Sequence, residues 1–173
     1  FMAVDKAGLT LEQRIAKRTM DIIFSVCALI VASPIMLLCA LAIRIEDGGP
    51  VIFRQQRATR GGEIFEIYKF RTMRPNAQHD KSATDDDQRI TKVGAFLRRY
   101  RLDELPQFVN ILKGEMSVVG PRPEMLSNVR DYTRALPEFS YRLRVKAGLT
   151  GYAQIAGKYN TLPKDKMLLD LMY

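Results

Sequence analysis

An uncharged apolar run from Ile22 to Ile43 is the feature that most constrains the fold of this chain. A helix over this run is about 33 Å long at 1.5 Å per residue, which is enough to cross the hydrocarbon core of a bilayer. Ser33 and Pro34 interrupt the run near its middle. Proline removes a backbone donor and clashes with the preceding turn, so we expect a bent helix in which Ser33 donates to a carbonyl freed by the break.

Basic residues flank this run on both sides. The positive-inside rule would then place both flanks on the cytoplasmic side of the membrane. A bent helix that enters and leaves on one face satisfies this rule, and an ordinary kinked span is the alternative. The flanking cations are Arg14, Lys17 and Arg18 before the run, and Arg44, Arg54, Arg57 and Arg60 after it.

The rest of the chain combines short strands with amphipathic helices. Val51–Phe53 and Ile64–Tyr68 are typical of two strands joined across Gly61-Gly62, a hairpin signal. A basic amphipathic helix around 92–101 suits an anionic interface. We expect a helix-rich α/β or α+β fold with one small β-hairpin sheet, anchored by a re-entrant membrane helix and amphipathic interfacial helices. Further helices are predicted at 105–113, 124–135 and 137–145.

The net charge of +8 requires an anionic partner, and the candidates are nucleic acid, a membrane surface and a phosphorylated substrate. A basic nucleic-acid-binding module would explain the charge but not the uncharged run. Nothing in the sequence resembles a stacking platform or a recognition helix, so we expect no nucleic-acid partner. Cys27 and Cys39 both lie within the apolar run, and a disulfide framework is not expected.

Adjacent carboxylates at Asp103 and Glu104 lie at the joint between two predicted helices, with basic residues just upstream. Positive charge there would hold at least one carboxylate ionised beside a bound anion. The alternative is that Asp103 caps the helix containing Leu105 and Gln107. The local sequence alone favours this capping interpretation, because aspartate is common at helix N-caps.

Two stretches carry cations suited to phosphate. Arg122 lies between Pro121 and Pro123, so its backbone is stiff and extended. It suits either bidentate phosphate recognition or a rigid turn with a solvated side chain. Lys69 and Arg71 end the second predicted strand, where they either hold a diphosphate or line a solvated face.

Two weaker signals lie elsewhere. The glycines of 148–152 allow a tight loop near a ligand. Residues 74–87 are polar and typical of a mobile loop, and they include His79, the only histidine. Because His79 has no partner cluster, a metal site there is not expected.

These motifs, taken in order, resemble the bacterial sugar transferases, the monotopic polyprenyl-phosphate phosphoglycosyl transferases that begin glycan assembly. The resemblance runs from Lys17-Arg18 to the last residues. One departure is Lys146-Ala147, where the family usually has a proline in second place. The motifs are Ser33-Pro34, Tyr68-Lys69-Phe70-Arg71-Thr72-Met73, Arg89-Ile90-Thr91-Lys92-Val93-Gly94, Leu102-Asp103-Glu104-Leu105-Pro106-Gln107, Val119-Gly120-Pro121-Arg122-Pro123-Glu124 and Gly148-Leu149-Thr150-Gly151-Tyr152-Ala153-Gln154.

The resemblance implies a phosphoglycosyl transferase at the cytoplasmic face of the bacterial inner membrane. It would move a sugar phosphate from a UDP-sugar to polyprenyl phosphate, release UMP and require Mg²⁺. Asp103 would be the nucleophile and a metal ligand, with Glu104 its partner. Lys69, Arg98 and Arg122 fall where the family places phosphate-contacting cations. A catalytically inactive membrane scaffold of the same fold is the alternative, and homo-oligomerisation stays open.

The resemblance also divides the chain. We expect a linker and amphipathic N-terminal helix at 1–18, the re-entrant helix at 19–47 and a cytoplasmic catalytic domain at 48–173. The chain opens at Phe1 and closes on an apolar stretch with helical spacing and no stop signal. We therefore expect it to be part of a longer protein.

Overall fold

The computed structural model describes residues 10–75, 87–156 and 163–171. Its longest element is helix α1 (Leu11–Asp47), which is one continuous helix of 37 residues. Thr10 and Gln13 form a capping box at its start, and Gly48 ends it in the left-handed conformation with φ 69°. The basic segment before the apolar run and the run itself therefore share one helix.

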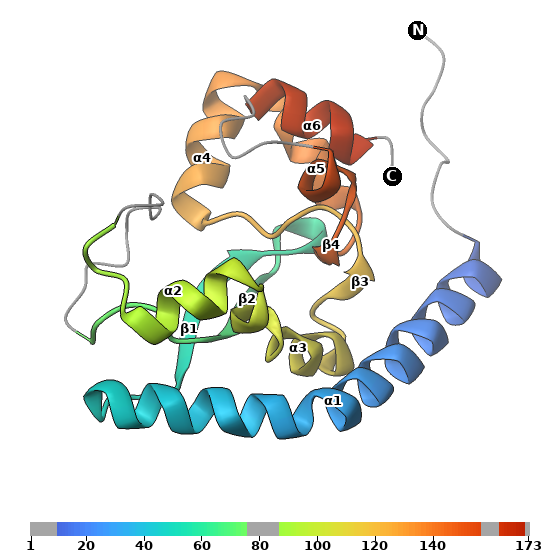
Figure 1. Cartoon of the computed structure of the whole chain (residues 1–173). Helices are drawn as coiled ribbons and strands as arrows, with labels where there is room; N and C mark the ends of the chain where they lie inside the picture. The colour runs from blue at the N-terminus through green and yellow to red at the C-terminus, as the bar shows by residue number, and fades with distance from the viewer. Residues whose placement is uncertain (1–9, 76–86, 157–162, 172–173) are drawn as a thin grey trace, which may run out of the picture.

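Helix α1 bends partway along its length (Figure 1). Pro34 lies inside the helix and has no N–H to donate to the carbonyl of Ile30, four residues back. The hydroxyl of Ser33 donates to that carbonyl at 2.8 Å. The expectation that Ser33 satisfies a carbonyl freed by proline is confirmed.

The predicted hairpin is present and longer than expected. Strand β1 (Ile52–Ala58) pairs antiparallel with β2 (Ile64–Phe70), so that Phe53 lies opposite Lys69. A short 3-10 turn, η1 (Arg60–Gly62), joins the strands. Gly61 and Gly62 have φ of 71° and 80° there, a region that favours glycine.

Four short elements follow the hairpin: α2 (Lys92–Arg99), the 3-10 turn η2 (Leu102–Glu104), α3 (Gln107–Lys113) and β3 (Ser117–Val119). The last part of the described chain contains α4 (Leu126–Ala135), the 3-10 segment η3 (Pro137–Arg144), β4 (Gly148–Thr150), α5 (Tyr152–Ile155) and α6 (Pro163–Leu171). Strand β3 pairs in parallel with β4, so the described residues form two small sheets rather than the single one expected. The helix-rich α+β character is confirmed.

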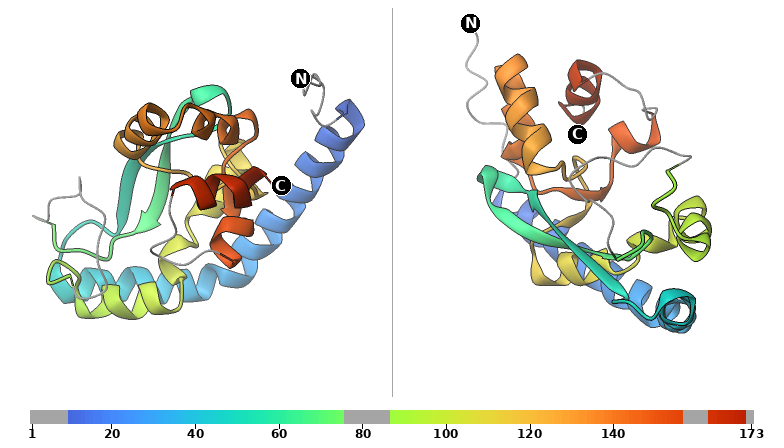
Figure 2. Two further views of the ribbon diagram at one scale, coloured as in Figure 1. Left: turned by 90° about the horizontal axis from the view of Figure 1, so that it is seen from above. Right: turned by 90° about the vertical axis from the view of Figure 1, so that its left-hand side faces the viewer.

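The other elements lie on one side of α1 (Figure 1). Helix α1 runs along one edge, α2 and α3 lie against it, and α4, α5 and α6 lie on the far side of the hairpin (Figures 1 and 2). Two hydrophobic clusters fill the space between them. One contains Phe65, Ile67, Phe108, Ile111, Met116 and Ala147, and the other contains Cys39, Ile43, Phe70 and Leu97. Cys27 and Cys39 are both free thiols, as expected.

Polar contacts tie the N-terminal half of α1 to the globular part. The Arg18 guanidinium donates to the carbonyls of Ile111 and Leu112 at 2.5 and 2.6 Å, at the C-terminal end of α3. The Ile111 carbonyl also accepts from the Gly114 amide at 2.9 Å, and a cation at this end of α3 favours the helix dipole. The buried Asp21 carboxylate accepts from the Val118 amide at 3.0 Å.

The C-terminal end of α1 is tied to the same globular part. Asp47 forms an ion pair with Arg71, which follows β2. Glu46 accepts from the backbone amide of Lys92 at 2.8 Å and so satisfies the start of α2. Both ends of the apolar run are therefore attached to one body.

Candidate active site

The two adjacent carboxylates lie in η2, between α2 and α3. Arg101 has a φ of 56° just before them, and this left-handed residue turns the chain between the two helices. The N-cap of α3 is Pro106, and no side chain caps that helix. The interpretation of Asp103 as a helix cap is therefore wrong.

Glu104 is the centre of a charge cluster. Its side chain is 11% exposed, and its Oε1 accepts from Lys69 Nζ and from Arg122 Nη2, each at 3.0 Å. Burial alone would raise the pKa of this carboxyl, but the charges and hydrogen bonds of Lys69 and Arg122 lower it to about 2. Glu104 is therefore an anion that holds two cations in place.

Asp103 differs from Glu104 in its ion pairing and in the direction of its pKa shift. It forms no ion pair with any residue in the described part of the chain. Burial raises its pKa and Glu104 adds to this effect, while Lys69 and Arg98 oppose it. The two neighbouring carboxyls thus have pKa values pushed in opposite directions, a pattern typical of paired groups in catalytic sites.

The position of Lys69 follows from how β2 is held. Asn110 on α3 is fully buried, accepts from the Tyr68 amide at 3.0 Å and donates to the Glu66 carbonyl at 2.6 Å. These bonds fix the second half of strand β2 against α3, so that Lys69 meets Glu104. Burial lowers the pKa of Lys69, and Glu104 opposes that shift.

The position of Arg122 follows from a close backbone approach. A Cβ on Gly148 would lie 2.1 Å from the Gly120 amide nitrogen, so only glycine fits there. The Gly148 amide donates to the Pro121 carbonyl at 2.8 Å. The glycines of 148–152 thus shape the turn that carries Arg122. The sequence had predicted that they form a tight loop near a ligand.

Two more arginines flank this cluster. Arg98 donates from Nε to Thr72 Oγ1 at 2.8 Å, and its charge acts on Asp103. Arg57 was not predicted as a site residue. Burial lowers its pKa to about 10, and its charge interacts with Arg122 and Glu104. The alternation of β1, which places Phe53, Gln55 and Arg57 on the less exposed face, is the signal that could have found it.

Arg71 is placed differently from the other predicted cations. Its guanidinium pairs with Asp47 and donates to the carbonyls of Pro50 at 2.6 Å and Met73 at 2.9 Å. It is 4% exposed, so it joins α1 to β2 and has little surface for a ligand. Its predicted phosphate contact gains no support from these bonds.

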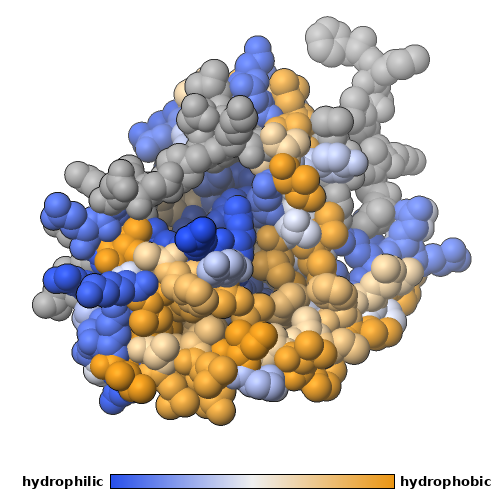
Figure 3. All heavy atoms as spheres, viewed as in Figure 1, coloured by the Kyte–Doolittle hydropathy of each residue, from blue (hydrophilic) through white to orange (hydrophobic). Residues whose placement is uncertain are grey.

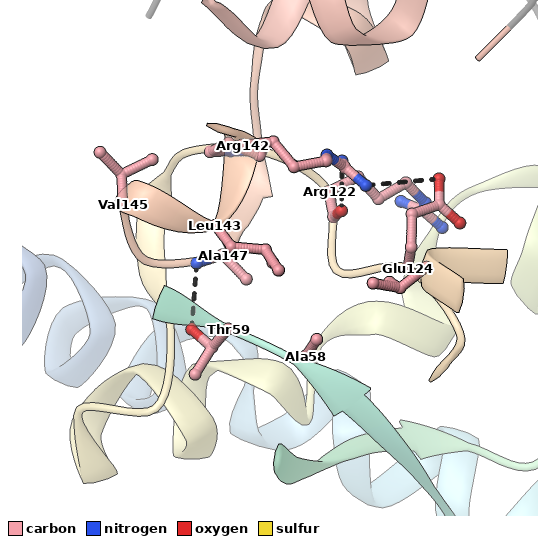
Figure 4. Close-up of a pocket in the computed structure, with 10 residues that line it drawn as sticks. Ala58, Thr59, Arg122, Glu124, Arg142, Leu143, Val145 and Ala147 are labelled. Carbon is pink, nitrogen blue, oxygen red and sulfur yellow. Dashed lines mark hydrogen bonds and ion pairs between the residues drawn. The ribbon is translucent and has the colours of Figure 1, made fainter. Parts of the chain in front are cut away.

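The cluster reaches the surface through Arg122, whose side chain is 39% exposed. A hollow lined by hydrophilic side chains lies directly above a hydrophobic band where α1 runs (Figure 3). A small pocket opens beside Arg122 and Glu124 (Figure 4). His79 lies outside the described residues, and within them no three His, Cys, Asp or Glu side chains form a metal-binding group.

Sequence comparison identifies the family of proteins to which this fold and site belong. Residues 12–173 match the family model of the bacterial sugar transferases, and the chain belongs to that family. It is 47% identical over 145 residues, 83% of its length, to a UDP-N-acetylgalactosamine-undecaprenyl-phosphate N-acetylgalactosaminephosphotransferase of Aeromonas hydrophila. It is 43% identical over 168 residues, 92% of its length, to a UDP-glucose:undecaprenyl-phosphate glucose-1-phosphate transferase of Escherichia coli.

The relatives are longer proteins. The chain spans 34% of the Aeromonas protein and 36% of the Escherichia coli protein. It covers 54% of a UDP-glucose:undecaprenyl-phosphate glucose-1-phosphate transferase of Caulobacter vibrioides, with 42% identity over 143 residues. The match to the family model spans every residue of the cluster around Glu104.

Proposed function

We propose that this chain catalyses transfer of a sugar phosphate from a UDP-sugar to undecaprenyl phosphate, with release of UMP. The observation that carries the proposal is the half-buried Asp103, which has no ion pair among the described residues, beside an ionised Glu104 that holds Lys69 and Arg122. Both substrates are anions, so cations must offset their repulsion before any attack. The printed names of the relatives describe this class of reaction.

The reaction proceeds in two displacements. An Asp103 carboxylate oxygen attacks the phosphorus that bears the sugar, its bond to the bridging oxygen breaks, and UMP leaves with that oxygen. A phosphate oxygen of undecaprenyl phosphate then attacks the same phosphorus, which forms the lipid diphosphate and frees the Asp103 carboxylate. Lys69 and Arg122 offset charge on the phosphoryl oxygens in both steps. Glu104 keeps these cations aligned.

Mg²⁺ fits this residue set. The ion is usually bound by one or two carboxylates together with substrate phosphates, and Asp103 is a carboxylate without an ion pair among the described residues. When bound, Mg²⁺ would neutralise charge on the donor diphosphate. The protein contribution to this site is Asp103.

Removal of the metal is expected to stop the reaction. Chelation with EDTA should lower UMP release by about 100-fold or more, and added Mg²⁺ should restore it, because metal stabilisation of phosphoryl charge contributes several kcal/mol. UMP release from detergent-solubilised protein with undecaprenyl phosphate and a panel of UDP-sugars is the assay. An unchanged rate in EDTA would exclude a metal requirement, and no release from any donor would favour the inactive scaffold.

We propose that α1 enters and leaves the membrane on the cytoplasmic face of the inner membrane. The helix is long and apolar enough to cross, and it is mostly uncovered by the described protein. Its side chains Ile30, Val31, Leu37 and Leu38 are 62% to 77% exposed. Because both ends are tied to one globular body, a bent helix keeps that body on one side.

Helix α2 supports the same placement. It is amphipathic and lies beside α1 (Figure 2). Phe96 and, just after the helix, Tyr100 are each 56% exposed, with ring centroids 4.8 Å apart. Exposed aromatic rings next to arginines are typical of helices that lie in a membrane interface. The site would then face the surface where a lipid phosphate and a soluble nucleotide meet.

The re-entrant arrangement predicts equal labelling at both ends of the helix. In a background without Cys27 and Cys39, Glu12→Cys and Pro50→Cys should both react with an impermeant thiol reagent in inverted vesicles and not in intact cells. Labelling from opposite sides would contradict it. Pro34→Ala restores the missing donor and removes the clash, so it should shift part of the protein towards a full span.

A further inference from the structure

Arg142 is a buried cation that the proposed mechanism does not use. It lies in η3, is 4% exposed, and packs its guanidinium 4.8 Å from the ring centre of the fully buried Phe139. Its Nε donates to Asp170 Oδ2 at 3.0 Å, and its Nη2 forms an ion pair with the same oxygen at 2.8 Å. Asp170 lies on α6 and is itself 5% exposed. A charge pair as buried as this is held by specific partners, and loss of one partner leaves the other uncompensated.

The same guanidinium reaches the turn that carries Arg122. Arg142 Nη2 also donates to the backbone carbonyl of Arg122 at 2.8 Å, and the two side chains converge in Figure 4. The Arg122 side chain in turn donates to Glu104. A continuous series of contacts therefore runs from Asp170 on α6 through Arg142 and Arg122 to Glu104.

The rest of the turn shows why this contact matters. Its first residues are fixed by backbone bonds, from the Gly120 amide to the Thr150 carbonyl at 2.9 Å and from the Gly148 amide to the Pro121 carbonyl at 2.8 Å. Pro123, the next residue after Arg122, has no N–H to donate. Arg142 therefore supplies the bond that sets the peptide plane after Arg122.

An alternative acceptor lies close to Arg142. Glu124 Oε1 is 4.0 Å from its Nη1, against 2.8 Å for Asp170 Oδ2 and its Nη2. Without the Asp170 charge, Glu124 becomes the strongest nearby attraction, and the guanidinium would move towards it. Such a movement weakens the bond to the Arg122 carbonyl and frees the turn to rotate.

We propose that Asp170 and Arg142 are positioning residues through which helix α6 fixes the backbone of Arg122, so that its guanidinium meets Glu104 and the donor phosphate. This inference rests on the proposed function for its kinetic consequence, while the geometric consequence stands by itself. The C-terminal helix thus belongs to the site although it contributes no group to the reacting atoms. Displacement of α6 would lower the rate without touching either carboxylate.

A double-mutant cycle tests the positioning role. Asp170→Asn should lower kcat/KM for UMP release about tenfold, and Arg122→Ala should lower it about 30-fold or more. Because Asp170 acts through Arg122, the double variant should be no slower than Arg122→Ala alone. Asp47→Asn is the matched control, since it also removes the carboxylate partner of a buried arginine, Arg71. The fold loss in kcat/KM caused by Asp47→Asn should multiply with the fold loss caused by Arg122→Ala.

A spectroscopic readout makes the test independent of turnover. In protein labelled with ¹⁵N-arginine, the side-chain signal of Arg122, assigned by its absence in Arg122→Ala, should shift in Asp170→Asn in the same direction as in Glu104→Gln. It should not shift in Asp47→Asn. If Asp170→Asn does not fold, Arg142→Lys keeps the charge but cannot reach Asp170 and Arg122 together, and the same shift is expected.

The outcomes separate the two proposals. A wild-type protein that releases no UMP refutes the proposed function and leaves the Arg122 signal to decide the positioning role. Multiplicative losses for Asp170→Asn and Arg122→Ala, or an Arg122 signal unmoved by both Asp170→Asn and Arg142→Lys, would overturn the positioning role.

Discussion

Asp103→Asn is expected to lower UMP release by about 1,000-fold or more, which corresponds to ~4 kcal/mol of lost transition-state stabilisation. The amide is nearly the same size as the carboxylate, so the packing around η2 should be kept. It neither attacks phosphorus nor binds Mg²⁺ well. The measurement is the initial rate of UMP release with saturating UDP-sugar and undecaprenyl phosphate.

Asp131→Asn is the matched control for this change. Asp131 lies exposed on α4, so the same substitution there should leave the rate and the melting temperature unchanged. A fully active Asp103→Asn protein would refute the nucleophile assignment. Direct attack of the lipid phosphate on the donor would then be the better mechanism.

Glu104→Gln is expected to damage both stability and activity. A neutral amide cannot hold Lys69 and Arg122 at one oxygen as the carboxylate does, and Lys69, whose side chain is 18% exposed, would lose its counter-charge. A fully buried pair would cost ~3–5 kcal/mol to break, and we expect about 2 kcal/mol here because the Arg122 side chain is 39% exposed. UMP release should fall about 100-fold as both cations lose their alignment.

The pH dependence of unfolding tests this assignment separately. The pKa of Glu104 is about 2 in the folded protein, below its usual 4.5. Its ionised form therefore stabilises the fold above pH 4.5, and this contribution is lost as the pH falls towards 2. Thermal unfolding in EDTA should show a steeper loss of stability over that range in the wild type than in Glu104→Gln.

Glu66→Gln provides the comparison for the stability effect. Glu66 lies 3.9 Å from Arg54 in a pair whose side chains are 52% and 64% exposed. Solvent screens such a pair, so its loss should change the free energy of unfolding by less than ~0.5 kcal/mol. Equal effects at Glu66 and Glu104 would contradict the view that Glu104 organises a buried cluster.

Features that depend on neighbouring residues could be predicted from the sequence. The apolar run, the proline that breaks it and the Ser33 bond to Ile30 all follow from spacing within one helix. The Gly61-Gly62 turn follows from the need for positive φ. In these segments the pattern and the local geometry carry the same information.

Features that join distant segments could not be predicted in this way. Strands β3 and β4 are three residues long, too short for alternation to show, and they pair residues about 30 positions apart. Lys69 and Arg71 look equivalent in the sequence, yet β2 ends between them. Lys69 therefore meets Glu104 while Arg71 turns to Asp47 on α1.

The buried arginines illustrate the same limit. Arg142 reads as one of many cations in a basic chain, and only the fold shows that its partner is Asp170, 28 residues away. Arg57 reads as a flanking charge of the membrane segment, and only the fold brings it near Arg122 and Glu104. Residue type indicated which groups carry charge, and tertiary contacts decide which of them act on the site.

The mass of the intact protein after incubation with UDP-sugar alone, without any lipid acceptor, tests the central claim most directly. Two-step transfer through Asp103 predicts a burst of UMP of about one equivalent and a mass gain of one sugar phosphate, with both absent in Asp103→Asn. Addition of undecaprenyl phosphate should then return the protein to its original mass. UMP release that requires the lipid from the outset, with no change in protein mass, would contradict the covalent mechanism.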